Sequence, residues 1–482
     1  MAADNDLGLP PCSVAQVAER VEGSVAGSAD VVVVGITHDS RQVQPGWLFV
    51  CVRGASVDGH EFVDAAISAG ASAVLVERHI DVAVPQIIVS STRLSMAAAA
   101  AEIYGNPSLK LKVIGVTGTN GKTSVVHLLA DVLGHAGASV RTVGTLSGDR
   151  TTPESPDLQR QLAIWHRQGV EFVAMEVSSH ALELHRVLAT RFAAVVFTNL
   201  GRDHLDFHHD VESYFEAKAK LFTREYSDTA VINVDDEYGR QLMERIDAQP
   251  GIDAWPFGRS DISDVVLGGD KSTWSWRGHQ ISVPLVGSHN VINALAVVAV
   301  STAIGLDPDA VIGGLASAGP IRGRFETVDS GQPFVVAVDY AHTADALEAL
   351  LATGRELTTG ELTIVFGCGG DRDRSKRPEM GRVALQGADR VIVTTDNPRT
   401  EDPSDIIEQI LLGMNGEQRS RYEVEFDRRR AIKLALTDAR QGDVVLIAGK
   451  GHETTQVIGS QTLEFDDVQV VREILANLKV NR

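Results

Sequence analysis

The chain has 482 residues, of which 44% are hydrophobic and 22% are charged, an ordinary balance for a globular protein. This length exceeds what one hydrophobic core usually organises, so the sequence predicts roughly two to four domains. The formal charge of -20 disfavours nucleic acid and anionic membranes as partners, because like charges repel.

The sequence also predicts the cellular compartment. Residues 1–11 lack the basic and apolar segments of a secretory signal. The longest apolar runs, such as residues 294–306, are shorter than the ~20 residues that span a bilayer. The chain has only three cysteines, Cys12, Cys51 and Cys368, and an odd number cannot all pair in disulfides. A small set without a disulfide framework is typical of a reducing compartment. We therefore expect a cytoplasmic protein, and we expect it to be a monomer.

Residues 1–108 alternate short apolar runs with turns and then become rich in alanine. The apolar runs lie at residues 31–36, 47–52, 73–76 and 86–89. The alanine-rich segment, residues 95–104, predicts a helix, because alanine has the highest helix propensity. Pro107 disfavours helix in the residue before it and indicates a linker. This stretch predicts a small α/β domain.

Residues 109–320 contain near-continuous apolar strands at 112–117, 172–175 and 193–198, each of which runs into a polar cluster. Apolar strands that alternate with helices predict a parallel sheet covered on both faces. The first strand leads through Gly118, Thr119, Asn120 and Gly121 to Lys122, and a helix is predicted over residues 124–133. Glycines and a helix N-terminus in this arrangement are typical of a phosphate-binding loop.

The phosphate loop predicts ATP or GTP but does not distinguish between them. Lys122 is placed to reach the β- and γ-phosphates, and the Thr123 hydroxyl is placed to join a magnesium shell. Val116 stands where a strict Walker A motif has glycine, and an ordinary glycine-rich turn is the alternative. Glu176 ends the second strand, where a magnesium ligand would lie, although a helix-capping carboxylate would occupy the same position.

Residues 321–482 show strands at 334–338, 362–366, 390–394 and 444–448, with helices at 344–351, 403–412 and 428–439. This alternation predicts a doubly wound domain, in which ligands gather at the carboxyl ends of the strands. Polar motifs follow each strand, at residues 339–342, 367–372, 396–399 and 449–453. The predicted fold is therefore α/β with three domains, a central P-loop-type parallel-sheet ATPase domain and a C-terminal doubly wound Rossmann-like domain.

Taken in order, these motifs resemble those of the Mur ligase family along essentially the whole chain. The matching segments are residues 118–123, 175–180, 198–200, 203–206, 287–290 with Asn293, 323–326, 338–343 and 449–453. The resemblance implies a UDP-sugar domain over residues 1–108, an ATPase domain over 109–320 and a closing domain over 321–482. It also implies an ATP- and Mg²⁺-dependent ligase of peptidoglycan precursor synthesis.

The resemblance further implies roles for individual residues. ATP contacts would come from Gly118, Thr119, Asn120, Gly121, Lys122, Thr123, Ser124, Asn290, Arg324, Asp339 and His342. Metal would be held by Thr123, Glu176, His204 and Lys218, the last as a carbamate, and the catalytic residues would be Lys122, His204 and Lys218. Ser40 would contact the uridine, and the muramoyl dipeptide would be held by Thr151, Thr152, Ser178 and Arg186.

Residues 37–41, 46–50 and 58–60 resemble the branch of the family that adds a third residue to UDP-MurNAc-L-Ala-D-Glu. The selector of the incoming amino acid would be Asp396-Asn397-Pro398-Arg399, whose arginine form resembles the members that add meso-diaminopimelate. Meso-diaminopimelate carries a second carboxylate that lysine lacks, and this carboxylate suits the planar guanidinium groups of Arg372 and Arg399. Asn397 and Glu453 would address the ammonium, and Asp396 and Gly449 would complete the site. In isolation the tetrapeptide has the composition of an ordinary turn.

The activity expected from the resemblance is ATP-dependent addition of meso-diaminopimelate through an acyl phosphate. An L-lysine-adding enzyme and a folylpolyglutamate synthetase are the nearest alternatives; Arg399 disfavours the first and residues 58–60 disfavour the second. A P-loop NTPase that acts as a switch or binding module belongs to a different class. It would bind or hydrolyse nucleotide without any dependence on an amino acid.

Overall fold

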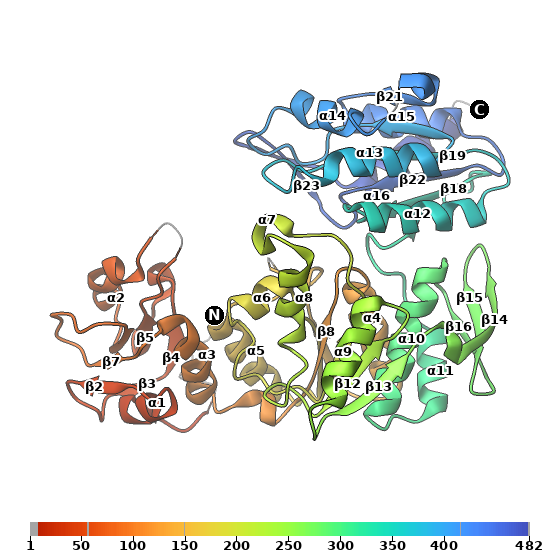
Figure 1. Ribbon diagram of the computed structural model, residues 1–482. Coiled ribbons are helices and arrows are strands. Elements are labelled where there is room, and N and C mark those ends of the chain that lie inside the picture. The colour runs from red at the N-terminus through yellow and green to blue at the C-terminus, as the bar shows by residue number, and fades with distance from the viewer. Residues whose placement is uncertain (1–7, 55–56, 149, 415, 481–482) are drawn as a thin grey trace.

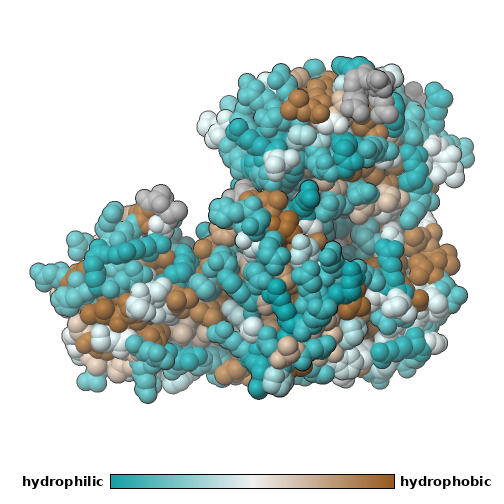
Figure 2. Space-filling model, viewed as in Figure 1, coloured by the Kyte–Doolittle hydropathy of each residue, from teal (hydrophilic) through white to brown (hydrophobic). Residues whose placement is uncertain are grey.

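The computed structural model describes residues 8–54, 57–148, 150–414 and 416–480, so the expectation drawn from the first seven residues lies outside it. The chain forms three lobes, with the first and the third both attached to the middle one (Figure 1). Figure 2 shows a largely hydrophilic surface with an open notch between the two outer lobes. Within the described ranges, no helix is both long enough and apolar enough to cross a membrane.

The first lobe is a five-stranded sheet with helices on both faces. In spatial order its strands are β2 (Ser24–Ala26), β7 (Gln86–Ile88), β6 (Ala73–Val76), β5 (Trp47–Val50) and β4 (Gly35–Thr37). The helices are α1 (Val14–Arg20), α2 (Val63–Ser68) and α3 (Thr92–Ile103), and β1 (Cys12–Ser13) pairs with β3 (Val32–Val33). The helix predicted from residue 95 begins earlier, because Ser91 accepts a hydrogen bond from Leu94 N and caps it.

The middle lobe contains the predicted parallel sheet, and its phosphate loop leaves a central strand. The strand order is β13 (Asp253–Phe257), β12 (Thr229–Asn233), β11 (Ala194–Phe197), β8 (Lys112–Thr117), β10 (Phe172–Glu176) and β9 (Val140–Val143). One face packs against α4 (Lys122–His135), α10 (Ser288–Ala303) and α11 (Pro308–Ala316). The other packs against α5 (Ser155–Arg167), α8 (Val211–Ala219) and α9 (Glu237–Asp247).

Several parts of the middle lobe were not predicted from the sequence. They include β9, β12, β13, the short helices α6 (Ser179–Glu183) and α7 (Leu205–His208), and an antiparallel sheet of β14 (Ile262–Leu267), β15 (Ser272–Trp276) and β16 (His279–Val283). In β15, buried and partly exposed residues alternate. Such a half-buried strand gives a weaker hydrophobic signal than the continuous apolar runs of β8 and β11.

The third lobe is the predicted doubly wound domain. Its strand order is β17 (Glu326–Thr327), β18 (Val335–Asp339), β22 (Val444–Ala448), β19 (Leu362–Phe366), β20 (Arg390–Val393) and β21 (Tyr422–Val424), with only β17 antiparallel. One face is covered by α12 (Ala344–Leu357), α13 (Lys376–Gly387) and α14 (Pro403–Leu411). The other is covered by α15 (Arg428–Asp438) and α16 (Asp467–Val480), and β23 (Thr455–Ile458) forms a hairpin with β24 (Gln461–Glu464).

Candidate active site

The phosphate loop depends on glycine at two positions. Gly118 has a φ of 148°, and a Cβ built on it would lie 1.9 Å from Thr198 Oγ1. Gly121 has a φ of 85°, and its Cβ would lie 2.3 Å from Asn293 Oδ1. Thr198 Oγ1 also donates to Asn120 O at 2.6 Å, which ties the loop to the end of β11. Only glycine allows this close backbone approach.

Lys122 and Thr123 form the first turn of α4 and therefore stand where the helix N-terminus offers positive potential. Lys122 Nζ donates to Gly118 O at 2.9 Å and to Thr119 O at 2.8 Å. Burial lowers the pKa of Lys122, although the negative charge of Glu176 opposes this shift. Ser124 follows in the same turn and is buried.

Glu176 ends β10 beside the phosphate loop, and its side chain is engaged by the loop rather than by the next helix. Its Oε1 accepts hydrogen bonds from Thr123 Oγ1 at 3.0 Å and from Thr145 N at 2.9 Å. The helix-capping role is filled by Ser178, whose Oγ accepts from Ala181 N at 3.2 Å. Adjacent carboxylate and hydroxyl oxygens are the donor types that Mg²⁺ prefers, so this part of the site fits the metal.

Lys218 is the most deeply buried cation near the phosphate loop, with 1% of the residue exposed. Its Nζ donates to Gly118 O at 2.9 Å and lies 4.4 Å from the centre of the Tyr214 ring. Burial, and secondly the positive charge of Lys122, lower its pKa well below the ordinary value for lysine. An amine in this environment favours its neutral form, which is the nucleophilic form.

His204 lies opposite the third domain in a left-handed conformation, with a φ of 56°. Its Nε2 is 3.4 Å from Asp203 Oδ2, and Asp203 also faces His342 Nε2 at 3.8 Å and Lys376 Nζ at 3.9 Å. Burial lowers the pKa of His204 to about 3 despite the opposing charge of Asp203. This shift favours the neutral imidazole. In the described part of the chain, no three His, Cys, Asp or Glu side chains are grouped as a metal site.

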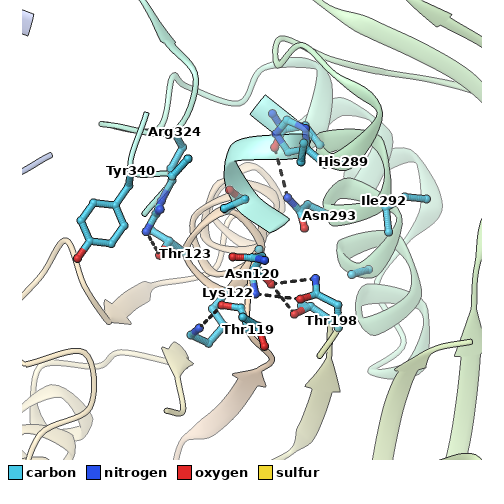
Figure 3. Close-up of a pocket in the computed structure, with 18 of the residues that line it drawn as sticks. Thr119, Asn120, Lys122, Thr123, Thr198, His289, Ile292, Asn293, Arg324 and Tyr340 are labelled. Carbon is cyan, nitrogen blue, oxygen red and sulfur yellow. Dashed lines mark hydrogen bonds between the residues drawn. The ribbon is translucent and has the colours of Figure 1, made fainter. Parts of the chain in front are cut away.

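A cavity of about 400 Å³ lies between the second and third domains and brings most of the predicted ATP residues together. From the predicted site it is lined by Thr119, Asn120, Gly121, Lys122, Thr123, Ser124, Thr151, Glu176, Ser178, His204, Asn290, Arg324, Asp339 and His342. Figure 3 shows Arg324 and Tyr340 on one side of Thr123, with Asn293 on the other.

Residues near the junction of the second and third domains form another wall of this cavity. Arg324 Nη2 donates to Thr123 Oγ1 at 2.9 Å, and its guanidinium group lies 4.7 Å from the centre of the Tyr340 ring. Asp339 accepts hydrogen bonds from two backbone N–H groups at 2.7 Å, and burial raises its pKa. Asn290 Nδ2 donates to Val286 O at 2.9 Å, which fixes the first turn of α10.

Of the residues predicted for the muramoyl dipeptide, Thr151 and Ser178 line the same cavity, and Thr152 and Arg186 lie beside them. Thr152 Oγ1 donates to Glu176 O at 2.9 Å, and Arg186 Nη1 donates to Thr152 O at 3.2 Å. Ser40 is apart from them: it begins a short 3-10 turn after β4 in the first domain and is not among the residues that line the cavity. A ligand that contacts both regions must extend from the first domain to the second.

The residues predicted for the incoming amino acid form a separate group in the third domain. Asn397 Nδ2 donates to Glu453 Oε2 at 2.6 Å, and a Cβ built on Gly449 would lie 2.3 Å from Asp396 Oδ2. Burial, and secondly the nearby Asp396 carboxylate, raise the pKa of Glu453. None of these residues lines the cavity beside the phosphate loop.

Asp203, Lys376 and Tyr340 were missed as site residues by the sequence reasoning. Asp203 stands in the motif at residues 203–206, where the pattern gives it no role of its own, and Lys376 lies in a run of charged residues with no distinctive spacing. Both become notable only because β11 and α13 bring opposite charges from two domains together. Tyr340 could have been found from the sequence, because an aromatic residue within the motif at residues 339–342 could pair with a cation near the site.

Comparisons with known proteins extend these observations to the whole chain. Family models described as "Mur ligase family, catalytic domain", "Mur ligase middle domain" and "Mur ligase, glutamate ligase domain" match residues 32–116, 116–301 and 323–451. A UDP-N-acetylmuramoyl-L-alanyl-D-glutamate–2,6-diaminopimelate ligase from Syntrophomonas wolfei is 43% identical, over 93% of this chain and 96% of its own. The enzyme of the same name from Geobacter metallireducens is 44% identical, over 92% and 94%.

Solved structures agree with the sequence comparisons. A structure titled as a UDP-N-acetylmuramoyl-L-alanyl-D-glutamate–2,6-diaminopimelate ligase superposes with a TM-score of 0.68 at 32% identity, over 98% of this chain and 100% of that one. The MurF ligase of Thermotoga maritima, solved in complex with ADP, shares the fold with a TM-score of 0.65 at 21% identity, over 93% and 98%. Matches of this extent in all three domains show that the chain belongs to the Mur ligase family.

Proposed function

We propose that this protein is an ATP-dependent ligase that joins meso-diaminopimelate to UDP-MurNAc-L-Ala-D-Glu during synthesis of peptidoglycan precursors. The observation that carries the proposal is the shared cavity. It is lined both by Lys122 of the phosphate loop and by Thr151 and Ser178, the residues predicted for the dipeptide. A γ-phosphate and a substrate carboxylate would therefore meet there, and the curated relatives carry the name of this activity.

The proposed reaction has two steps. An oxygen of the D-Glu γ-carboxylate attacks the γ-phosphorus of ATP, and ADP leaves, so that an acyl phosphate forms. The amine of meso-diaminopimelate then attacks the acyl carbon, and after loss of a proton the inorganic phosphate leaves. Lys122 would hold the phosphate oxygens during the first step, and Arg324 would approach from the hinge to stabilise the developing charge.

Magnesium would be held by Thr123 and Glu176, whose side-chain oxygens lie 3.0 Å apart, together with His204 and Lys218. When bound, the ion would neutralise charge on the phosphate oxygens. The Lys218 ammonium is a poor ligand for a cation, but a carbamate on Nζ is a carboxylate-like one. The neutral His204 imidazole would serve as a ligand without losing a proton.

The incoming amino acid would bind to the third domain, and closure of that domain would exclude water from the acyl phosphate. Arg372 and Arg399 would take its distal carboxylate, while Asn397 and Glu453 would take its ammonium group. Lysine lacks the distal carboxylate and would leave the two guanidinium groups without a partner. For this reason an L-lysine-adding enzyme is the less favoured of the two candidate functions. We further propose that the protein is cytoplasmic and monomeric.

The test is phosphate release by the purified protein with Mg-ATP and UDP-MurNAc-L-Ala-D-Glu, with meso-diaminopimelate, L-lysine or no amino acid. The proposal expects phosphate and a UDP-tripeptide with meso-diaminopimelate alone. Turnover with lysine would retain the ligase and reject the assigned amino acid. Hydrolysis that is independent of the amino acid would reject the ligase reaction.

A further inference from the structure

Arg372 and Arg399 lie on two neighbouring loops, so the spacing of their guanidinium groups depends on how these loops are joined. The first loop, residues 367–375, follows β19, and the second, residues 394–402, follows β20. The strands β19 and β20 are adjacent and parallel. Both loops therefore leave the same edge of the sheet, where ligands of doubly wound domains bind.

The two loops pack backbone against backbone. A Cβ built on Gly370 would lie 1.9 Å from Pro398 O, so no larger residue fits there. Arg399 Nη1 donates to Gly370 O at 2.6 Å. A Cβ built on Gly369 would lie 3.1 Å from Arg399 Nη1 and 3.8 Å from Arg372 Cγ. The two arginine side chains therefore approach the same point from different loops.

A buried ion pair joins the loops beneath this contact. Arg377, in the first turn of α13, has a fully buried side chain and donates to both oxygens of Glu401, at 3.0 and 2.9 Å. Arg377 Nη2 also donates to Gly369 O at 3.1 Å, and Glu401 Oε1 accepts from Asp371 N at 2.6 Å. The ion pair thus bonds to the main chain of the first loop on both sides of Gly370. Because Glu401 belongs to the second loop, the pair joins the two loops.

A second connection lies at the surface, where Thr400 Oγ1 donates to Asp371 Oδ1 at 2.8 Å. Asp371 and Arg399 both have a φ of 51°, a left-handed conformation that is uncommon for residues with side chains. Such conformations persist when the surrounding contacts hold them. The loops are therefore held in one arrangement by the buried pair and by this surface bond.

We propose that Arg377 and Glu401 are positioning residues that fix the spacing between Arg372 and Arg399 and thereby select an amino acid with a second carboxylate. The inference rests on the proposed function, because it concerns the same amino-acid site. Two guanidinium groups bind one carboxylate well only when their geometry is set in advance. An acceptor without that carboxylate gains nothing from the spacing.

The experiment compares the holoenzyme with its Glu401→Gln variant, which keeps the shape of the side chain but removes the charge that holds Arg377. The matched control is Glu423→Gln. Glu423 pairs with Arg390 at the amino end of β20, at distances of 3.0 and 2.5 Å, away from both loops. For each protein, KM and kcat are measured for meso-diaminopimelate, L-lysine, ATP and the UDP-dipeptide, with melting temperature as a check on folding.

We expect Glu401→Gln to raise the KM for meso-diaminopimelate by ~10-fold or more, since small misplacements of binding groups have effects of this order. The KM values for ATP and the UDP-dipeptide stay unchanged, and the preference for meso-diaminopimelate over lysine falls by the same factor. The control variant keeps the wild-type preference. An equal loss with both amino acids, or no loss with either, would overturn the proposal.

If Glu401→Gln does not fold, Arg377→Lys decides the question, because it keeps the positive charge but lacks the planar fork that donates to both oxygens of Glu401. A rise in KM confined to meso-diaminopimelate supports the proposal, and an unchanged KM rejects it. The wild-type assay separates this outcome from the proposed function. If the wild type shows no turnover with meso-diaminopimelate, the function has failed; if it does and both variants behave like it, only the positioning role has failed.

Discussion

At the scale of single residues, Lys218 combines deep burial with a position beside a second cation, Lys122. Its Nζ donates to Gly118 O and lies over the Tyr214 ring, and the positive charge of Lys122 adds to the effect of burial in lowering its pKa. A second ammonium beside Lys122 would repel it in a site of low dielectric constant. Addition of carbon dioxide to the neutral amine would replace this repulsion by attraction.

We predict that activity depends on dissolved carbon dioxide. Protein depleted of bicarbonate should lose most of its turnover and recover when bicarbonate is returned, because a carbamate on Lys218 would form reversibly. The Lys218→Arg variant should stay inactive under both conditions, since its guanidinium group does not form a carbamate. Phosphate release under controlled gas composition measures this effect. Equal turnover with and without bicarbonate would contradict the prediction.

What the sequence predicted for individual residues followed from where strands end. The phosphate loop and Glu176 stand directly after buried apolar strands, so their meeting at one sheet edge follows from parallel pairing. Lys218 lies inside a helix, and its burial depends on how α8 packs beneath the loop. No local pattern reports such packing. Only the family resemblance predicted Lys218 as a metal ligand.

At the scale of elements, the helices α3 and α5 join the first domain to the second through one carboxylate. Glu154, directly before α5, lies 2.7 Å from Arg93 Nη1 of α3 and 2.9 Å from Arg186 Nε. Burial raises the pKa of Glu154, but the charges of Arg186 and Arg93 outweigh it and leave the pKa lowered. The carboxylate therefore stays ionised and orients Arg186 toward the residues predicted for the dipeptide.

Glu154→Gln should raise the KM for the UDP-dipeptide by ~10-fold, because an Arg186 side chain without its charged partner is held less firmly. The KM values for ATP and the amino acid should not change. Glu473→Gln, which weakens the exposed pair with Arg429 in the third domain, serves as the control in the same kinetic assay. A KM for ATP that rises equally would contradict a role confined to the dipeptide.

The Glu401 carboxylate, in the loop after β20, makes the stability of the fold depend on pH. Bonding to Arg377 lowers the pKa of Glu401 from 4.5 to about 2. A carboxyl group with a lowered pKa stabilises the fold above its ordinary pKa, and this contribution is lost as the pH falls toward the lowered value. We predict that the melting temperatures of wild type and Glu401→Gln differ most above pH 4.5 and converge below it, as measured by calorimetry. A gap that widens at low pH would reverse the sign.

Element prediction succeeded where burial on two faces left a continuous apolar run, as in β8, β19 and β22. It failed for the largely exposed β14, for β15 and β16, in which buried and more exposed residues are mixed, and for α13. The short strand β12 was also missed, although four of its five residues are buried. Helix α13 begins in the charged run Lys376-Arg377, where the apolar spacing is interrupted. The buried partner that neutralises Arg377, Glu401, is remote in sequence, so the burial of this arginine was not predictable.

At the scale of the whole molecule, the third domain docks onto the second through a contact at Gly201. Arg202 N donates to Asp345 Oδ2 at 3.1 Å, and a Cβ built on Gly201 would lie 2.2 Å from the same oxygen. Asp345 stands in the first turn of α12. The contact adjoins Asp203 and His204, so it contributes, with the pairs that Asp203 makes with His342 and Lys376, to the distance between the third domain and the proposed metal site.

Gly201→Ala should lower kcat by ~3-fold, since the added methyl group displaces the Asp345 carboxylate and weakens the contact that aligns the two domains. The double variant with Asp345→Ala should recover part of this loss, because removal of the carboxylate makes room for the methyl group. Steady-state turnover measures both effects. If Gly201→Ala has the wild-type kcat, the contact does not limit the approach of the domains.

The residues proposed for the incoming amino acid all belong to the third domain, whereas the phosphate loop and the dipeptide residues belong to the second. Mutations that alter the accepted amino acid would therefore fall in the third domain and leave the phosphate loop of the second domain unchanged. A lineage could change the cross-linking chemistry of its cell wall through a few substitutions in the loops after β19 and β20. An inhibitor confined to the phosphate loop would remain effective against such a lineage.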